Sequence, residues 1–283
     1  MIHPIQLRPD RSHDALSAEI GRSAIWALYT ELSLAPKPGL VSPLDNGSHV
    51  DMDMGTFMRS LSALRPYYRE IAAAGAADAP FATLARLGQA AERRMLAATG
   101  GINTHRGAVF CIGLLAAAAG LRRVMGLDVP LGRIVSDRWG PEIMAAGTKA
   151  SPSHGSLAVR GHGVRGARQE AAEGFPTLYR IVLPALHQAL AVTGCRERAG
   201  IQALFASMAH LADTNLLHRG GKPGLDFIRE RAGAFLAGGG ALRAGWREEA
   251  LALHRDSVAR WLSPGGSADM LAAVWFLWSQ GEG

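Results

Sequence analysis

The sequence predicts an all-α protein, a single-domain bundle of about ten helices with polar active-site loops between them. Apolar residues recur at helical spacing along most of the chain, whereas alternating β-type segments of useful length are hard to find. Aromatic residues make up only 6% of the 283 residues, so the core has to be built from Ala, Leu, Val, Ile and Met, and small side chains of this kind favour closely packed helices. We expect a flexible tail over residues 1–13 and one catalytic domain over 14–283.

The first helix is predicted from Ser17, where Ile20, Ala24 and Leu28 begin an apolar stripe. Glu31 falls on the same stripe. A carboxylate in that position is costly to bury unless it is paired or bound to a ligand. Two prolines and a glycine in residues 35–39 then end the helix.

Apolar periodicity and turn residues predict the later helices as well. The stretch 126–165 carries repeated Gly, Pro, Ser and His, so we expect it to be irregular. Ser267 is a natural N-cap for the last helix, and Asp269 suits the dipole of its first turn. The predicted helices span residues 54–74, 81–98, 104–125, 166–173, 177–192, 199–217, 224–236, 243–262 and 267–279.

Lysine and arginine exceed aspartate and glutamate by 30 to 24, which gives a net charge of +6. This balance suits an anionic partner, although the charge taken alone favours a solvated basic surface. The arginines are scattered and no basic run is interleaved with aromatics, so we expect no nucleic-acid partner. The N-terminus lacks the apolar core of a signal peptide, and the longest uncharged stretch, 107–121, is shorter than a membrane span. We therefore expect a cytoplasmic protein that does not bind membranes.

The polar segment 36–53 follows the first helix and offers Lys37, His49, Asp51 and Asp53. In an extended chain His49 and the two aspartates point to one side. Two carboxylates beside a histidine can hold Mg²⁺, which prefers few carboxylates plus phosphate oxygens. The alternative is that the two aspartates only cap and charge the next helix.

A second polar segment, residues 100–108, precedes the longest apolar helix. Asn103 or Thr104 can cap that helix, and its first N–H groups can face an anion. Capping does not explain the adjacent His105 and Arg106, so this segment favours a phosphate site.

The third segment, residues 151–176, contains a GxGxxG pattern with no preceding strand, which argues against a Rossmann dinucleotide site. Glu170 and Glu173 are three residues apart on a predicted helix and share one face near a loop. A solvated acidic face is the ordinary explanation for charges at this spacing.

The fourth segment, residues 213–224, begins where a buried helix ends. Asp213 and Asn215 lie next to His218 and Arg219, a set that can bind a metal-bound phosphate chain. The sequence contains no P-loop, GxSxG or HExxH motif, which argues against a P-loop kinase, an α/β-hydrolase and a zinc protease.

Together these segments resemble the triphosphoribosyl-dephospho-CoA synthase family. The motifs are PKPGLV with GSHVDMD, GINTHRGA, SHG with GVRGARQEAAEGFP, DTNLLHRGG and PGGSADML, and they span residues 31 to 273 in the family's order. The middle and later segments look most like the malonate decarboxylase branch. One departure is Ser42, a position that is often acidic in the family, for which Asp45, Asp51 or Asp53 would have to compensate.

The resemblance implies a specific transferase reaction. The 2′-hydroxyl of 3′-dephospho-CoA attacks C1′ of ATP, adenine leaves, and the triphosphate stays on the transferred ribose. The product is the precursor of a prosthetic group, which a separate transferase attaches to an acyl carrier protein. The resemblance also allows a homodimer.

The reaction needs a base, support for an oxocarbenium-like centre and cations for a triphosphate. We expect Glu170, Glu173 or Asp51 to act in catalysis and Mg²⁺ to be bound by Asp51, Asp53 and Asp213. The same reaction serving citrate lyase, an ADP-ribosyl hydrolase-like Mg²⁺ enzyme and a non-catalytic nucleotide-binding module remain alternatives. The expected substrate-binding residues are Lys37, His49, Asn103, His105, Arg106, His154, Arg165, Asn215, His218 and Arg219.

Overall fold

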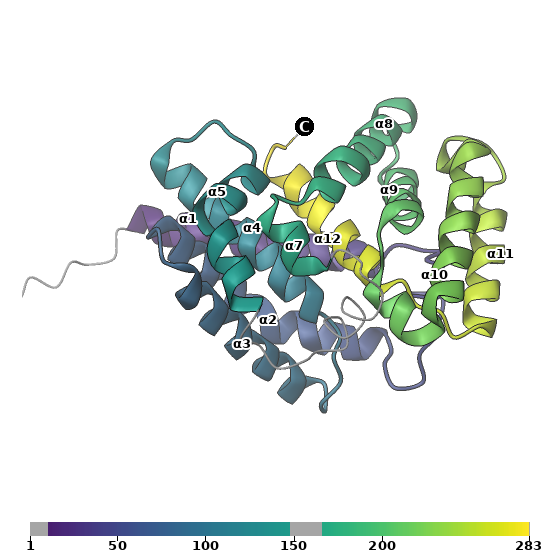
Figure 1. Cartoon of the computed structure of the whole chain (residues 1–283), viewed down its shortest axis with the longest axis horizontal. Coiled ribbons are helices and arrows are strands. Elements are labelled where there is room, and N and C mark those ends of the chain that lie inside the picture. Colours follow the sequence, from purple (N-terminus) through teal and green to yellow (C-terminus); the bar gives the residue numbers. More distant parts are fainter. Residues whose placement is uncertain (1–10, 148–165, 283) are drawn as a thin grey trace, which may run out of the picture.

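The computed structural model describes residues 11–147 and 166–282, and in these ranges the chain is helical with no strand (Figure 1). This confirms the all-α prediction. The α-helices are α1 (Arg11–Leu32), α2 (Met54–Ala76), α3 (Phe81–Ala98), α4 (Arg106–Met125), α5 (Leu131–Gly147), α7 (Ala167–Ala172), α8 (Leu183–Thr193), α9 (Arg196–His210), α10 (Thr214–Ala237), α11 (Trp246–Ala259) and α12 (Gly265–Ser279). A π-helical turn, η1 (Leu178–Val182), precedes α8, and a 3₁₀ turn, η2 (Gly240–Leu242), follows α10.

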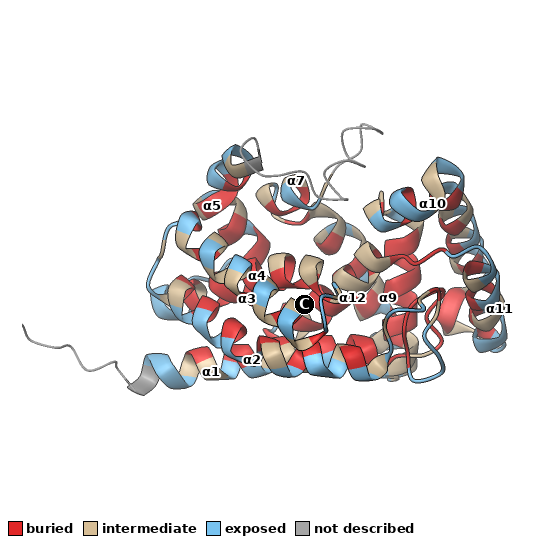
Figure 2. Ribbon diagram, turned by 90° about the horizontal axis from the view of Figure 1, so that it is seen from below, coloured by how far each residue is buried: buried red, intermediate tan, exposed pale blue. Residues whose placement is uncertain are grey.

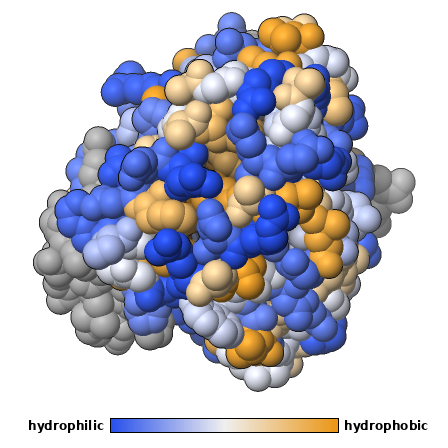
Figure 3. All heavy atoms as spheres, turned by 90° about the vertical axis from the view of Figure 1, so that its right-hand side faces the viewer, coloured by the Kyte–Doolittle hydropathy of each residue, from blue (hydrophilic) through white to orange (hydrophobic). Residues whose placement is uncertain are grey.

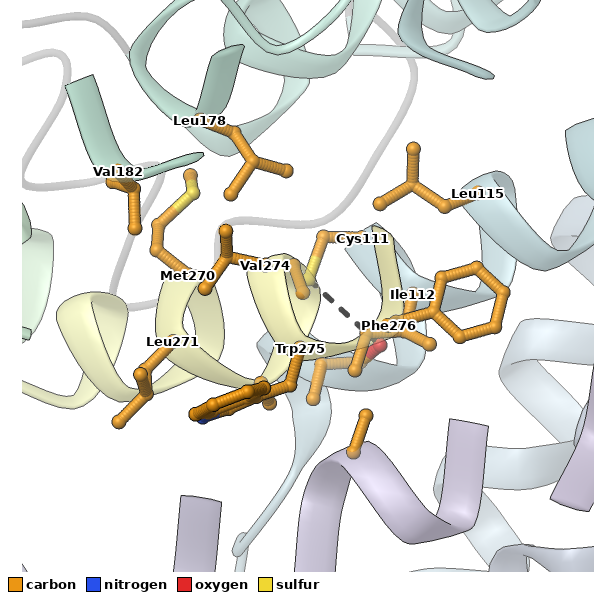
Figure 4. Close-up of a cluster of buried hydrophobic side chains, with 14 of the residues drawn as sticks. Cys111, Ile112, Leu115, Leu178, Val182, Met270, Leu271, Val274, Trp275 and Phe276 are labelled. Carbon is orange, nitrogen blue, oxygen red and sulfur yellow. Dashed lines mark hydrogen bonds between the residues drawn. The ribbon is translucent and has the colours of Figure 1, made fainter. Parts of the chain in front are cut away.

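Two helices, α4 and α12, form the centre of the bundle. The run from Met270 to Leu277 in α12 is buried throughout, as is the run from Cys111 to Leu121 in α4. Figure 4 shows side chains from α12 and α4 packing against each other and against η1. The remaining helices turn their buried faces inward and their exposed faces outward, which is the pattern expected for helices around one core (Figure 2).

Small residues let α2 and α4 approach each other closely. A Cβ atom on Gly75 would lie 2.0 Å from the carbonyl oxygen of Ala117, and one on Gly120 would lie 2.2 Å from that of Ala72. Neither position can therefore hold a larger residue without moving the helices apart. The alanine- and glycine-rich composition of the chain is thus what sets the spacing at the centre of the bundle.

Among the described helices, α4 is long and apolar enough to cross a membrane by length and composition, but 72% of its most apolar window is buried inside the protein.

The prediction that residues 126–165 are irregular is wrong for the part that the structure describes. Helix α5 occupies Leu131–Gly147, and Leu131, Val135 and Trp139 are fully buried along it. This spacing of four residues is the periodicity of a helix. The glycines, serine and Pro141 of the segment hid the pattern, but tertiary burial of one apolar face outweighs their weak local preferences.

The predicted helix boundaries are also wrong around residues 199–223. We expected one helix to continue to residue 217, but α9 ends at His210 and Asp213 caps the start of α10. Helix α10 then runs through residues 218–223 with a kink at Gly221 (φ 61°), where a break between helices had been predicted. At the N-terminus α1 begins at Arg11, so residues 11–13 of the predicted tail are helical.

Candidate active site

The segment 263–269, which includes the first turn of α12, lies next to three of the polar motifs. Figures 1 and 2 show α12 between the α4 and α10 sides of the bundle. Along this segment Ser263 contacts the 36–53 loop, residues 265–267 contact the start of α10, and Asp269 contacts the start of α4. The starts of α4 and α10 therefore lie next to the start of α12, so the positive ends of these three helix dipoles are close together.

Lys37 and Glu31 form an ion pair in the interior. The Lys37 ammonium donates to Oε1 of Glu31 at 2.5 Å and to the Glu31 backbone carbonyl at 2.9 Å. Both residues are at least 96% buried. Burial raises the pKa of Glu31 and lowers that of Lys37, and the pairing opposes both shifts. The expectation that Glu31 needs a partner is thus confirmed.

His105 is the N-cap residue of α4 and is also buried. Its Nδ1 lies 2.7 Å from the hydroxyl oxygen of Ser60, and its ring packs edge-on against Phe57. Burial and, to a smaller degree, the charge of Lys37 lower its pKa to about 3, so the ring is neutral near neutral pH. A neutral imidazole can exchange hydrogen bonds with a substrate, but it does not provide the positive charge expected of it for phosphate binding.

Asp213 ties two helix starts together. Its Oδ1 accepts from the backbone N–H groups of Asn215 and Leu216 in α10, at 2.9 and 3.4 Å. Its Oδ2 accepts from the N–H and hydroxyl of Ser267 in α12, at 2.9 and 3.3 Å. Burial raises its pKa, and these backbone donors oppose the shift. Ser267 is therefore not the cap of α12 that the sequence suggested, because the helix begins two residues earlier and the capping carboxylate comes from Asp213.

Asp269 lies on α12 against the first turn of α4. A Cβ atom on Gly107 would come within 1.9 Å of Oδ2 of Asp269, so only glycine leaves room for the carboxyl group. Burial, followed by the charges of Asp213 and Glu31, raises its pKa well above the ordinary value, and the amide of Ala108 acts in the opposite direction. Asp269, which is partly exposed, thus joins four buried residues in a polar cluster that we define as Glu31, Lys37, His105, Asp213 and Asp269.

A second, more exposed group lies beside this cluster. Arg219 donates to the carbonyl oxygen of Ser48 at 2.8 Å and lies 3.0 Å from Nδ1 of His49, whose Nε2 lies 2.9 Å from the hydroxyl of Ser263. Burial and the charge of Arg219 lower the pKa of His49 to about 4, so His49 is neutral near neutral pH. The end of the molecule formed by α10 and α11 is mostly hydrophilic, with hydrophobic residues as separate spots (Figure 3). Arg219 is the cation that this group can offer to an anionic substrate.

The three expected metal ligands differ in what they can still bind. Asp51 and Asp53 are exposed, and Asp53 uses Oδ1 to cap α2 through Thr56. The four donors on Asp213 occupy the roughly four lone-pair positions of its carboxylate. No group of three or more His, Cys, Asp or Glu side chains in the described ranges is placed to hold a metal ion. The residues therefore do not form a dedicated three-ligand site, and only Asp51 and Asp53 keep exposed oxygens.

Glu170 lies on α7 and Glu173 is the C-cap residue of that helix, and both are away from the segment 263–269 in sequence and in their contacts. The Glu170 carboxylate is buried and accepts from the backbone N–H and the hydroxyl of Thr177, at 2.6 and 3.2 Å. Glu173 is exposed, accepts from Gln169 and lines a cavity of about 370 Å³ between α5 and α7. Their catalytic roles remain predictions, and Glu170 already has a structural partner.

The other expected substrate-binding residues are placed as follows. Asn103 is exposed and its side-chain oxygen accepts from the Arg106 N–H at 3.2 Å, while the Arg106 guanidinium lies 3.1 Å from Glu92. Asn215 and His218 are exposed on α10. His154 and Arg165 lie outside the described residues.

Sequence reasoning did not single out Asp269 or His254 for the site. The signal for Asp269 was present, because PGGSADML was among the family-like motifs, but helix-dipole stabilisation explained it locally. His254 on α11 is buried and joins two parts of the 36–53 loop, with Nδ1 2.9 Å from the Lys37 carbonyl oxygen and Nε2 2.9 Å from Oδ2 of Asp45. No local pattern in α11 pointed to this contact, which depends on residues more than 200 positions away.

Comparisons with known proteins identify the family. The sequence profile of the family described as ATP:dephospho-CoA triphosphoribosyl transferase matches residues 17–283. No solved structure gives a significant match.

Among curated proteins, similar relatives cover nearly the full chain. A protein from Acinetobacter calcoaceticus, described as "Probable 2-(5''-triphosphoribosyl)-3'-dephosphocoenzyme-A synthase", is 38% identical over 277 residues, covering 94% of this chain and 95% of the relative. The 2-(5''-triphosphoribosyl)-3'-dephosphocoenzyme-A synthases of Pectobacterium atrosepticum and Klebsiella pneumoniae are 40% and 39% identical. They cover 92% and 98% of this chain and 88% and 95% of their own lengths.

Proposed function

This chain belongs to the ATP:dephospho-CoA triphosphoribosyl transferase family, and from that premise we propose that it moves the 5-triphosphoribosyl group of ATP to the 2′-hydroxyl of 3′-dephospho-CoA. The single observation that carries the proposal is the polar cluster at the start of three helices, which is assembled from the segments that resemble the family. It joins carboxyl groups to donors that are held in place by the fold, as a reaction with changing charge requires.

The chemistry is glycosyl transfer. The 2′-hydroxyl oxygen forms a bond to C1′ of ATP, and the C1′–N9 bond breaks with its electron pair passing to adenine. Positive charge develops at C1′, so carboxylates nearby stabilise the transition state. The hydroxyl proton has to leave and the adenine ring has to accept one, which makes acid–base groups useful on both sides of C1′.

The triphosphate is best matched to the exposed cations. Arg219 presents a guanidinium fixed by Ser48 and His49, and Arg106 lies partly exposed at the start of α4. A guanidinium binds phosphate oxygens in bidentate fashion. We assign Lys37 a positioning function instead, because its ammonium is buried and committed to Glu31.

We further propose that ATP enters as its Mg²⁺ complex. Mg²⁺ offsets part of the triphosphate charge and usually binds one or two carboxylates together with substrate phosphates. Asp51 and Asp53 have the exposed oxygens for this contact. Excess EDTA is expected to abolish turnover and added Mg²⁺ to restore it. Full activity in EDTA would overturn this part of the proposal.

The product is proposed to serve malonate decarboxylase, because the middle and later motifs look most like that branch. Citrate lyase is the alternative recipient. An intact-mass measurement distinguishes the two recipients. When each apo acyl carrier protein is given the product and its matching transferase, only the correct carrier gains the prosthetic group.

A cytoplasmic location remains a prediction.

Mass analysis of the products formed from ATP and 3′-dephospho-CoA tests the reaction itself. We expect free adenine and an acceptor whose mass has increased by one triphosphoribosyl group. Adenine release in the absence of 3′-dephospho-CoA would instead indicate a hydrolase. Binding of both nucleotides without adenine release would indicate a non-catalytic module.

A further inference from the structure

The position of Asp269 is unusual for a carboxyl group in a helix. It is partly exposed, and so are the residues around it, Gly107, Gly265, Gly266 and Ala268. The carboxyl group lies against Gly107 at the first turn of α4. Since neither Asp269 nor these neighbours are fully buried, a substrate atom can approach this part of the site.

The ionisable side chains that interact with Asp269 through their charge are mostly acidic. Asp213 caps α10 and Glu31 ends α1, and both raise the pKa of Asp269 in addition to burial. No cation of the described residues is among the groups that offset this effect, and the Lys37 ammonium is committed to Glu31. The other titratable groups that interact with Asp269 are the Tyr68 hydroxyl from α2 and the Cys111 thiol from α4, both of which are neutral near neutral pH because their own pKa values are raised by burial.

An independent observation at the same place indicates a missing partner. Among the described residues nothing forms a hydrogen bond with the buried Nε2 of His105, a residue that is 97% buried. His105 lies two residues before Gly107 in the chain, and its other ring nitrogen is already used by Ser60. A buried polar atom without a partner is rare and costly, unless a ligand completes it.

We propose that the Asp269 carboxyl group is the catalytic acid that gives its proton to a ring nitrogen of adenine as the C1′–N9 bond of ATP breaks. This rests on the transferase function proposed above. The electron pair of the broken bond goes to adenine, and the proton from Asp269 neutralises it. The acceptor 2′-hydroxyl releases one proton in the same turnover, so Asp269 can be reprotonated and no proton is consumed overall.

The surroundings favour an acid over a base in this position. A carboxyl group that shares a site with two other acids holds its proton at a pH where an exposed aspartate has lost it. Asp213 cannot take this role as easily, because four donors stabilise its charged form. The two aspartates thus have opposite tasks: Asp213 fixes the helix starts and Asp269 carries the proton.

The substitution Asp269→Asn tests the proposal, because it keeps the shape and removes the acid. We expect kcat with ATP to fall by about 100-fold or more, which is the usual contribution of a general acid, with little change in KM. The wild-type rate should decline at alkaline pH as Asp269 loses its proton, and the residual rate of the variant should lack that decline. A kcat within about threefold of wild type, or an unchanged alkaline decline, would overturn the proposal.

The leaving group provides a readout that a structural role would not affect. The purine of N7-methyl-ATP already carries a positive charge, so it can leave without receiving a proton. We expect Asp269→Asn to lose less than about 10-fold in kcat with this substrate. Equal losses with both substrates would show that Asp269 only supports the fold or the binding of ATP.

Two further variants serve as controls. Gly107→Ala places a methyl group where the Asp269 carboxyl lies and should lower kcat while the carboxyl group is still present. Asp256→Asn changes an exposed carboxylate on α11 and should leave kcat and the alkaline decline unchanged. If wild type itself releases no adenine, the transferase proposal fails. If wild type is active and Asp269→Asn is equally active, only the assignment of the acid fails.

Discussion

The Lys37 ammonium donates to both the side chain and the backbone carbonyl of Glu31, in the interior where the end of α1 meets the loop that follows it. The ion pair therefore fixes both the charge state of the site and the path of the chain as it leaves α1. His254 holds the same loop from the other side through the Lys37 carbonyl.

Removal of one member of this pair should be more harmful than removal of both. Lys37→Met leaves a buried carboxylate without its cation, and we expect the free energy of unfolding to fall by about 3–5 kcal/mol. The double variant Lys37→Met with Glu31→Leu should recover much of this loss but not adenine release. Urea unfolding measures the stability, and the exposed Lys222→Ala serves as the control, with an expected change below about 0.5 kcal/mol. If the double variant is no more stable than Lys37→Met, the unpaired charge of Glu31 is not the cause of the lost stability.

The buried, neutral His105 should make the protein sensitive to acid. Its folded pKa of about 3 lies below the ordinary 6.5, so the unfolded chain binds a proton that the folded chain does not. Between these two values the histidine lowers stability by about 1.4 kcal/mol for each unit of falling pH, and above pH 6.5 it contributes no slope. Urea unfolding of wild type and His105→Gln from pH 7 to pH 4.5 tests this, because the stability of wild type relative to the variant should decrease as the pH falls. Parallel pH curves would refute it.

Arg219 should act mainly in substrate binding. Arg219→Ala removes a guanidinium that is held by the Ser48 carbonyl, and we expect KM for ATP to rise about 10-fold or more with a smaller change in kcat. Arg219→Lys should recover only part of the affinity, because an ammonium cannot bind phosphate oxygens in bidentate fashion. Steady-state kinetics provide the measurement, with the exposed Arg255→Ala as control. An unchanged KM for ATP would remove Arg219 from the triphosphate site.

Measurements of stability and of turnover can distinguish a structural role from a catalytic role for Glu170 and Glu173. Glu170→Ala leaves the partly buried Thr177 N–H without its acceptor, so we expect a loss of about 1–3 kcal/mol in the free energy of unfolding. Glu173→Gln changes an exposed side chain and should alter stability by less than about 0.5 kcal/mol. If either residue is the base for the 2′-hydroxyl, its Gln variant loses kcat at temperatures where it is still folded. Near-normal kcat in both Gln variants would exclude the pair from catalysis.

Much of the fold was predictable because it depends on local rules. Apolar periodicity predicted the helices on either side of the site, and the Pro-Gly segment after Leu32 predicted the end of the first helix. The failures have a common cause. Residues 131–147 have a composition typical of loops, and the start of α10 depends on a cap that also serves α12. In both cases a distant contact outweighs the local preference.

The sequence by itself determined the helical class, the family and the segments that carry chemistry, because helix periodicity and motif spacing are short-range properties. It also showed that Glu31 would need a partner. Only the tertiary structure decided that the partner is Lys37, that Asp213 caps two helices and that Asp269 lies among acids rather than on a solvated first turn. The reason is physical: the pKa and the role of a carboxyl group depend on the charges and donors within a few ångströms, and here those come from elements far apart in the chain.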